Sequence, residues 1–299
     1  MTSPAGAANR VRIWCLAMRP RTLPAAVAPV LVGTAAAAGD GRLKLLPALI
    51  AMAGALLLQV AVNLANDYFD GCRGIDTNRR LGPIRATQSG LIAPVHVLGA
   101  MWLTLSLAVL CGLYLASVGG WPVVAIGLAS IAGVLGYSGG PYPLASHGLG
   151  DLCVFLFFGP VAVCGTYYVQ ALTLTGRVVL WAIPPGLLIT AILVVNNLRD
   201  RETDGETGKH TLAVKIGLRW TLREYAVLVL AAYALPPLML ARSAGSGFLL
   251  LPLLTLPMGI RSIRRLYQER GAALNLRLGA TAMLALWFCI LWSVGIAAS

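Results

Sequence analysis

Two short stretches place acidic and amide side chains at the ends of long apolar runs. The first is NLANDYFDGCRGID, residues 63–76, and the second is NNLRDRETDGETGKHT, residues 196–211. When Asn63 is aligned with Asn197, the stretches share an asparagine, a leucine, an aspartate and a glycine at the same spacing. Internal repeats are common in membrane bundles, where sites lie at the repeat interface. The repetition therefore indicates two copies of one functional motif.

The spacing of these polar residues predicts a stripe along one face of a helix. Gln59, Asn63, Asn66 and Asp70 follow one another at intervals of four, three and four residues, and residues at such intervals are neighbours on a helix. A second stripe consists of Thr190, Asn197, Asp200 and Asp204. We expect the two stripes to face each other and to gather carboxylates at one mouth. Carboxylates held that close repel unless a cation lies between them.

Carboxylate and amide oxygens in this number suit Mg²⁺, which is bound by one or two carboxylates together with substrate phosphates. Lys209, Arg79, Arg80 and Arg85 would add positive charge for an anionic group. The combination points to a diphosphate, and a site embedded in lipid points to a diphosphate with a long apolar tail. The alternative is that these residues only solvate helix ends and balance nearby arginines. The repetition, and the asparagines within the apolar runs, favour a functional site.

The composition is that of a membrane protein. The chain has 299 residues, of which 58% are hydrophobic and 11% charged, and its mean hydropathy is +0.78. An apolar helix of about 20 residues crosses a bilayer. We therefore expect an all-α integral membrane protein, a bundle of nine transmembrane helices, with residues 1–22 as a cytoplasmic N-terminal segment and residues 23–299 as a single domain. The predicted spans are Leu23–Ala38, Leu45–Ala65, Val97–Val118, Trp121–Tyr137, Leu152–Leu172, Val178–Val195, Tyr225–Leu240, Phe248–Ile260 and Leu274–Ala298.

The basic residues predict the orientation of the bundle. A net charge of +12 could indicate nucleic acid, but with nine spans 19 of the 23 Lys and Arg residues fall on the side of the N-terminus. This asymmetry follows the positive-inside rule. The basic residues are therefore explained by membrane orientation, and we expect no nucleic-acid partner. The asymmetry predicts a cytoplasmic N-terminus in a bacterial-type cell membrane, in contact with membrane lipid. Ten of the eleven acids, all but Asp40, fall on the same side, and carboxylates contribute little to orientation. We therefore expect them to serve a site that opens to the cytoplasm.

The two acidic stretches resemble the aspartate-rich motifs of the UbiA superfamily of intramembrane prenyltransferases. Further similar stretches are RPRTLPAAVAPVLVGT from Arg19, SGGPYP after Tyr137 and GLGDLCVFLFFGPVAVCGTYYVQ from Gly148. The resemblance is dense from about Arg19 to Gly217 and weak in the last three spans. Within the superfamily it is closer to the branch that acts on 1,4-dihydroxy-2-naphthoate in menaquinone biosynthesis.

The resemblance implies a nine-helix bundle in which the motifs face each other across a central cavity. It implies Asn66, Asp70, Asp200 and Asp204 as ligands of Mg²⁺ and diphosphate, with Asp67 and Asp76 as supporting acids. We expect Asp70, Asp204 and Lys209, which follows the second stretch, to be the catalytic residues. The candidate substrate-binding residues are Arg21, Asn63, Asn66, Asp67, Asp76, Arg79, Arg80, Arg85, Tyr137, Tyr142, Asn197 and Lys209. Relatives often carry Tyr-x-x-x-Lys in the loop after the fourth span, whereas here Pro141 follows Tyr137 at that spacing. Either Lys209 or an arginine supplies the missing charge, or this loop aligns differently.

The reaction implied by the resemblance joins a polyprenyl diphosphate to a small aromatic acceptor. With 1,4-dihydroxy-2-naphthoate as acceptor, CO₂ and diphosphate are lost and demethylmenaquinone is formed. A benzoate-type or non-aromatic acceptor is an alternative within the same family. An ion-coupled transporter is an alternative of another class, since paired polar stripes also suit ion sites, but transporter sites lie near mid-span and these acids lie at the ends. The prenyl chain length and the oligomeric state stay open.

Overall fold

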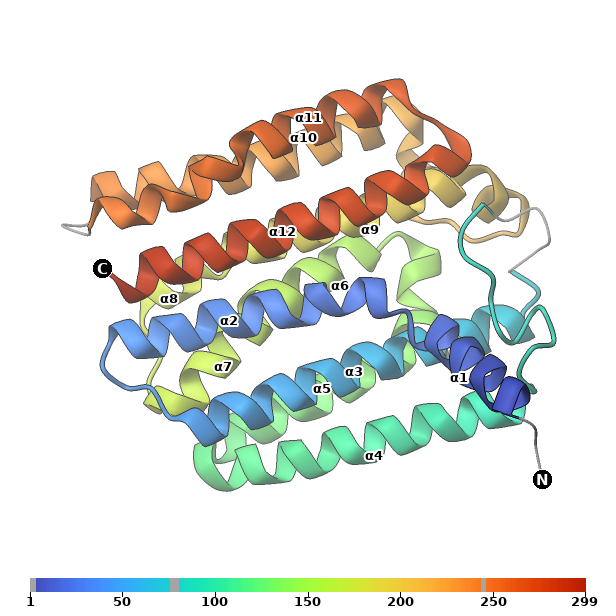
Figure 1. Cartoon of the computed structure of the whole chain (residues 1–299), viewed down its shortest axis with the longest axis horizontal. Helices are drawn as coiled ribbons and strands as arrows, with labels where there is room; N and C mark the ends of the chain where they lie inside the picture. The colour runs from blue at the N-terminus through green and yellow to red at the C-terminus, as the bar shows by residue number, and fades with distance from the viewer. Residues whose placement is uncertain (1–3, 76–80, 243–245) are drawn as a thin grey trace.

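The computed structural model describes residues 4–75, 81–242 and 246–299, and the regular elements in these ranges are all helices (Figure 1). The longer helices are α1 (Pro4–Met18), α2 (Leu23–Gly39), α3 (Leu45–Cys72), α4 (Pro94–Gly119), α5 (Trp121–Ser138), α6 (Gly150–Leu156), α7 (Ala162–Ala171), α8 (Gly176–Trp181), α9 (Ile183–Glu206), α10 (Leu212–Arg242), α11 (Leu256–Gln268) and α12 (Leu274–Ala297). Short 3₁₀ turns cover Pro20–Thr22, Leu144–His147, Gly247–Thr255 and Gly271–Ala273, and a π-helical turn covers Phe157–Val161.

Nine helical segments of the described chain are long and apolar enough to cross a membrane, which confirms the predicted number. They are Val11–Gly39, Leu45–Cys72, Pro94–Gly119, Trp121–Ser138, Gly150–Ala171, Gly176–Glu206, Leu212–Ala241, Gly247–Gln268 and Gly271–Ala297. The protein is therefore an integral membrane protein. Each backbone polar group inside lipid needs an internal partner, and helices provide one.

Proline residues interrupt two of these crossings. Pro160 lies in the π-helical turn between α6 and α7, and Pro252 lies in the 3₁₀ run before α11. Proline lacks an N–H and clashes with the preceding turn, which weakens a regular helix, although α2 continues through Pro29 and α10 through Pro236 and Pro237. At Pro160 and Pro252 the crossing is divided into two consecutive helical pieces.

The second and sixth crossings extend beyond the spans predicted from hydropathy. Those spans end at Ala65 and Val195, whereas α3 continues to Cys72 and α9 continues to Glu206. Hydropathy identifies only the apolar part of a helix. Here both helices continue beyond that part, through the polar residues of the acidic stretches. Both acidic stretches are therefore the final turns of long helices, and their polar side chains are held on a regular frame.

The helices pack through small residues. α12 lies beside α2, and α3 lies beside α4 (Figure 1). A Cβ at Gly33 of α2 would lie 2.5 Å from the carbonyl oxygen of Val163, and a Cβ at Gly295 of α12 would lie 2.5 Å from that of Phe248. Only glycine permits such close approach, as is usual between membrane helices. The buried apolar residues form a larger group around α2, α9 and α12 and a smaller one around α3 and α4.

Candidate active site

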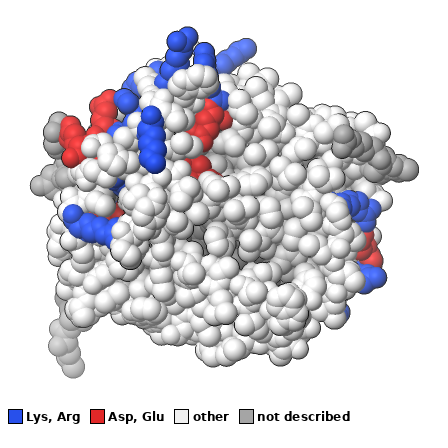
Figure 2. All heavy atoms as spheres, turned by 180° about the vertical axis from the view of Figure 1, so that it is seen from behind, with Lys and Arg blue, Asp and Glu red and all other residues white. Residues whose placement is uncertain are grey.

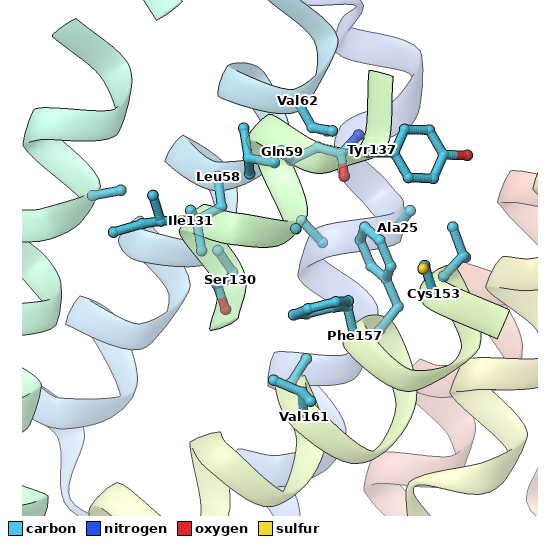
Figure 3. Close-up of a pocket in the computed structure, with 18 of the residues that line it drawn as sticks. Ala25, Leu58, Gln59, Val62, Ser130, Ile131, Tyr137, Cys153, Phe157 and Val161 are labelled. Carbon is cyan, nitrogen blue, oxygen red and sulfur yellow. The ribbon is translucent and has the colours of Figure 1, made fainter. Parts of the chain in front are cut away.

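A cavity of about 480 Å³ lies among α2, α3, α4, α5, α7 and α9. Most of its wall is apolar, and Figure 3 shows Leu58, Ile131 and Phe157 around this space. Leu113 and Leu128 line the cavity and are more than half exposed. The cavity therefore opens through the outer apolar surface of the bundle, between α4 and α5.

One end of the cavity is polar, and the two acidic stretches meet there. Asp70 from α3 and Asp204 from α9 line it and are 2% and 8% exposed. Asn66, Asn197 and Asp200 line the same end. These residues lie towards the C-terminal ends of α3 and α9. Their helical spacing places the residues of each stretch on one face of its helix. The structure thus brings together the residues that the sequence predicts as ligands, at the boundary of an apolar chamber.

Two cations face Asp70. Lys209 Nζ donates to Asp70 Oδ2 at 3.0 Å, and Arg85 Nη2 lies 3.6 Å from the same oxygen. Both basic residues line the cavity. Lys209 is directed there by a turn at the end of α9, because its backbone N–H donates to the Asp204 carbonyl at 2.8 Å and Gly208 adopts a φ of 76°. Glycine takes this left-handed conformation without a steric penalty.

The remaining acidic and amide groups have partners within the protein. Asp200 accepts two hydrogen bonds from Arg199, at 2.8 and 2.6 Å. Asn66 accepts one from Ser138 at 2.6 Å. These contacts orient the oxygens that line the cavity, and they reduce the repulsion that several buried carboxylates would otherwise experience. In the described part of the chain, no three or more His, Cys, Asp or Glu side chains cluster closely enough to hold a metal alone.

The polar stripe of α3 is anchored to the N-terminal segment along most of its length. Asn63 donates to the Met18 carbonyl and to Thr22 Oγ1, both at 2.9 Å, and Gln59 donates to Thr22 Oγ1 at 3.1 Å. Buried amides need such partners. All four members of the stripe line the cavity, and two of them, Gln59 and Asn63, are held by hydrogen bonds to the N-terminal segment.

Four residues singled out in the sequence are not part of the cavity wall. Asp67 is buried and accepts from the backbone N–H groups of residues 86 and 87, at 3.0 and 2.8 Å, so it holds the loop after α3. Arg21 is exposed and is not part of the cavity wall. Tyr142 is 58% exposed and stacks on His147 with ring centroids 3.5 Å apart. Thr190, the first member of the second stripe, donates to the Gly186 carbonyl and also lies outside the wall.

Other polar residues line the cavity without having been singled out as ligands. Arg19, two positions before Arg21, lies in its wall, as do Thr22 and Asn196. Arg19 has a φ of 52°, which turns the chain between α1 and the 3₁₀ turn at residues 20–22. The choice between Arg19 and Arg21 depends on this turn, which the sequence does not reveal. Asp76, Arg79 and Arg80 lie outside the described residues.

The family follows from the comparison with known proteins. The family model "UbiA prenyltransferase family" matches residues 26–286, which include both acidic stretches and extend from within α2 to within α12. This chain belongs to the UbiA prenyltransferase family. The resemblance seen in the sequence is thereby confirmed, and it extends into the last three spans, where the sequence motifs are weak.

Relatives within the UbiA family cover nearly the whole chain. A 1,4-dihydroxy-2-naphthoate octaprenyltransferase of Mycobacterium tuberculosis is 42% identical over 259 residues, 86% of this chain and 87% of that one. The enzyme of the same name from Escherichia coli is 37% identical over 96% of both chains. Among solved structures, a UbiA homolog from Archaeoglobus fulgidus bound to GPP and Mg²⁺ superposes with a TM-score of 0.66, at 13% identity, over 96% of this chain and all of that one. The likeness of that structure shows the shared UbiA fold.

The lysine that relatives often carry after Tyr137 is replaced here by Pro141. Tyr137 itself lines the cavity (Figure 3). Lys209 lines the same cavity and contacts Asp70. Of the basic residues that the sequence offers in place of the lysine, Lys209 and Arg85 both lie beside Asp70, whereas Arg79 and Arg80 lie outside the described residues.

Proposed function

We propose that this protein transfers a polyprenyl group from polyprenyl diphosphate to 1,4-dihydroxy-2-naphthoate, with release of diphosphate and CO₂. The observation that carries the proposal is the meeting of two acidic helix ends with Lys209 and Arg85 at the polar end of an apolar cavity. The naphthoate acceptor is supported by the names of the relatives, which match most of this chain.

The cavity suits a molecule with a charged head and a long apolar tail. The head would bind among Asp70, Asp204, Lys209 and Arg85, which line one end. The tail would lie along the apolar walls of α3, α4 and α5, which are built partly from small residues such as Gly54 and Gly127. Because the walls are as apolar as lipid, they can accommodate such a tail without exposing it to water. The opening between α4 and α5 would admit such a tail directly from lipid.

The polar end also fits Mg²⁺. Asp70 and Asp204 offer two carboxylates, and Asn66 and Asp200 offer further oxygens. This is the hard oxygen donor set that Mg²⁺ binds together with substrate phosphates, and the Archaeoglobus homolog was solved with that ion. When bound, the ion would stabilise the negative charge on the departing diphosphate. Lys209 and Arg85, which contact Asp70, would lie beside the same diphosphate.

The reaction breaks the allylic C–O bond, and the electron pair leaves with the diphosphate. Lys209 and Arg85 are placed to stabilise that charge as it develops. The allylic carbon becomes cationic, and the aromatic walls at Phe157 and Tyr137 can stabilise it through their π faces. The ring carbon that bears the carboxylate attacks, and a new C–C bond forms. Loss of CO₂ returns an electron pair to the ring and gives the quinol form of demethylmenaquinone.

We further propose that the site opens to the cytoplasm. In Figure 2 most charged side chains gather at one end of the molecule, with fewer at the opposite edge and a wide uncharged zone between. The basic residues of the first end include those beside the acidic cluster, and the opposite end carries Arg42, Lys44 and Arg177. The positive-inside rule assigns the richer end to the cytoplasm. By the same reasoning, residues 1–22 form a cytoplasmic segment and residues 23–299 one membrane domain.

The test is an assay of purified protein in lipid vesicles with Mg²⁺, octaprenyl diphosphate and a panel of acceptors. We expect a prenylated naphthoquinol, identified by mass spectrometry together with released CO₂. Product from a benzoate or from a non-aromatic acceptor instead would keep the protein a prenyltransferase but reject the naphthoate. Transport of an ion across sealed vesicles, without any prenylated product, would reject the enzyme.

A further inference from the structure

A buried arginine holds the second acidic stretch. Arg199 of α9 is 5% exposed, and its Nε and Nη2 donate to the two carboxylate oxygens of Asp200. Nη2 also donates to Asn196 Oδ1 at 2.8 Å, and Nη1 donates to Asn275 Oδ1 at 2.9 Å. The planar guanidinium fork has a fixed geometry, so its partners determine where it lies. The orientation of Asp200 in the cavity wall is therefore tied to Asn275.

Asn275 connects Arg199 to a second part of the site. It lies at the start of α12, and its Nδ2 donates to the carbonyl oxygen of Leu81 at 2.8 Å. Its amide thus accepts from a guanidinium and donates to a backbone carbonyl, and a reversed amide would satisfy neither contact. One side chain joins α9, α12 and the loop that follows α3.

That loop carries a cation of the site. Arg85 lies four residues after Leu81, and its guanidinium faces Asp70. Beyond Arg85, the backbone N–H groups of Ala86 and Thr87 donate to Asp67. The loop is consequently held on both sides of Arg85, by Asn275 on one side and by Asp67 on the other. Loss of either anchor would widen the range of positions open to the Arg85 side chain.

We propose that Asn275 is a positioning residue for prenyl diphosphate. It acts through Arg199 on Asp200 and through Leu81 on Arg85, so that one residue outside the two repeated stretches sets the spacing between an acid and a cation on opposite sides of the site. This inference rests on the proposed prenyl transfer, and it adds a residue from the region where the family motifs are weak. If Asn275 only stabilised α12, its replacement would change KM for both substrates and kcat together.

The two contacts can be separated with two substitutions. Asn275→Ala removes both, whereas Asn275→Asp keeps an oxygen that can accept from Arg199 and loses the donor to Leu81. Thr281→Val is the matched control, because Thr281 lies on α12 and its hydroxyl forms hydrogen bonds with the Tyr225 hydroxyl and with the Arg277 carbonyl, both at 2.9 Å, away from the cavity wall. For each protein we would measure KM for prenyl diphosphate and for the acceptor, kcat, and amide hydrogen exchange of residues 81–93.

Asn275→Ala is expected to raise KM for prenyl diphosphate about tenfold, the effect of losing one hydrogen bond to a charged group. KM for the acceptor should stay within about twofold, since Asn275 acts on Asp200 and Arg85, which we assign to the diphosphate and its metal. Exchange in residues 81–93 should rise in both Asn275 variants. Asn275→Asp should recover part of the loss in KM, because the contact with Arg199 remains. Thr281→Val should leave exchange in this loop unchanged.

Unchanged exchange in residues 81–93 in both variants would overturn the link to the loop. An equal rise of both KM values, as expected from general destabilisation and matched by Thr281→Val, would overturn the positioning role. If the wild-type protein forms no prenylated product, the proposed function fails separately, and the exchange measurement still decides whether Asn275 holds the loop. If Asn275→Ala does not fold, Asn275→Asp decides the same question.

Discussion

Lys209 Nζ lies 3.0 Å from Asp70 Oδ2, although the two residues are 139 positions apart in the chain. Asp70 belongs to the first acidic stretch and Lys209 follows the second, so this ion pair joins the two halves of the repeat. The Asp70 side chain is 3% exposed and that of Lys209 is 15% exposed. A buried carboxylate of this kind is strongly unfavourable without a cation. The contact with Lys209 therefore offsets part of the cost of burying Asp70.

The first prediction concerns this lysine. Lys209→Gln should weaken the use of prenyl diphosphate at least tenfold, since a charge-assisted contact contributes roughly 1.5–3 kcal/mol. KM for the aromatic acceptor should change much less. Steady-state kinetics with each substrate varied in turn provide the measurement.

Two matched variants control for charge. Lys209→Arg keeps a cation near Asp70 and should retain more activity than Lys209→Gln. Lys215→Gln removes a neighbouring lysine that is exposed and donates to the His147 carbonyl, outside the cavity wall. It should have little effect. Equal losses for Lys209→Gln and Lys215→Gln would show that only net charge matters here.

The second prediction concerns the two buried aspartates. Asp70→Ala and Asp204→Ala should each abolish prenyl transfer while the protein still inserts into membranes and purifies, because each removes a carboxylate from the polar end of the cavity. Activity of the wild-type protein should require Mg²⁺ or Mn²⁺ and disappear in excess chelator. Glu202→Gln is the control, because the Glu202 side chain is 86% exposed on the same helix. Full activity in chelator would exclude a metal-dependent site.

The sequence was sufficient to predict the number of crossings and the meeting of the acidic stretches, because both depend on local periodicity and hydropathy. The sequence predicted Arg21 as a substrate-binding residue, whereas Arg19 lines the cavity. The backbone at Arg19 is left-handed, and the sequence does not reveal such a turn. It also placed Asp67 among the substrate-binding residues, whereas the structure engages it with the backbone at residues 86 and 87. That contact joins residues far apart in the chain, and helical spacing contains no information about it. The roles of the individual ligands stay predictions.

The third prediction tests the orientation. Cys72 is the last residue of α3, directly after the first acidic cluster, and it is exposed. In a variant that keeps Cys72 as its single cysteine, a membrane-impermeant thiol reagent should label it in inverted membrane vesicles and not in intact cells. The reason is the excess of Lys and Arg at this end of the bundle. A second variant with a single cysteine in place of Gly41, at the opposite end, should label in the reverse pattern. Labelling of Cys72 in intact cells would reverse the assigned orientation.

The last prediction concerns the length of the prenyl chain. Gly127 of α5 lines the cavity, and a Cβ built there meets no atom within 4 Å. Gly127→Phe should therefore fold and fill part of the space proposed for the tail. Crowding an apolar space typically costs about 1–3 kcal/mol, so the use of octaprenyl diphosphate should fall about tenfold, while geranyl diphosphate should be affected much less. The control is Gly99→Phe on α4, where an added Cβ also meets nothing but the residue is exposed and outside the cavity wall. Competition between the two diphosphates in one reaction, with both products quantified, measures the shift. An unchanged product ratio would show that the tail does not pass Gly127, and would direct the search to the opening beside Leu113.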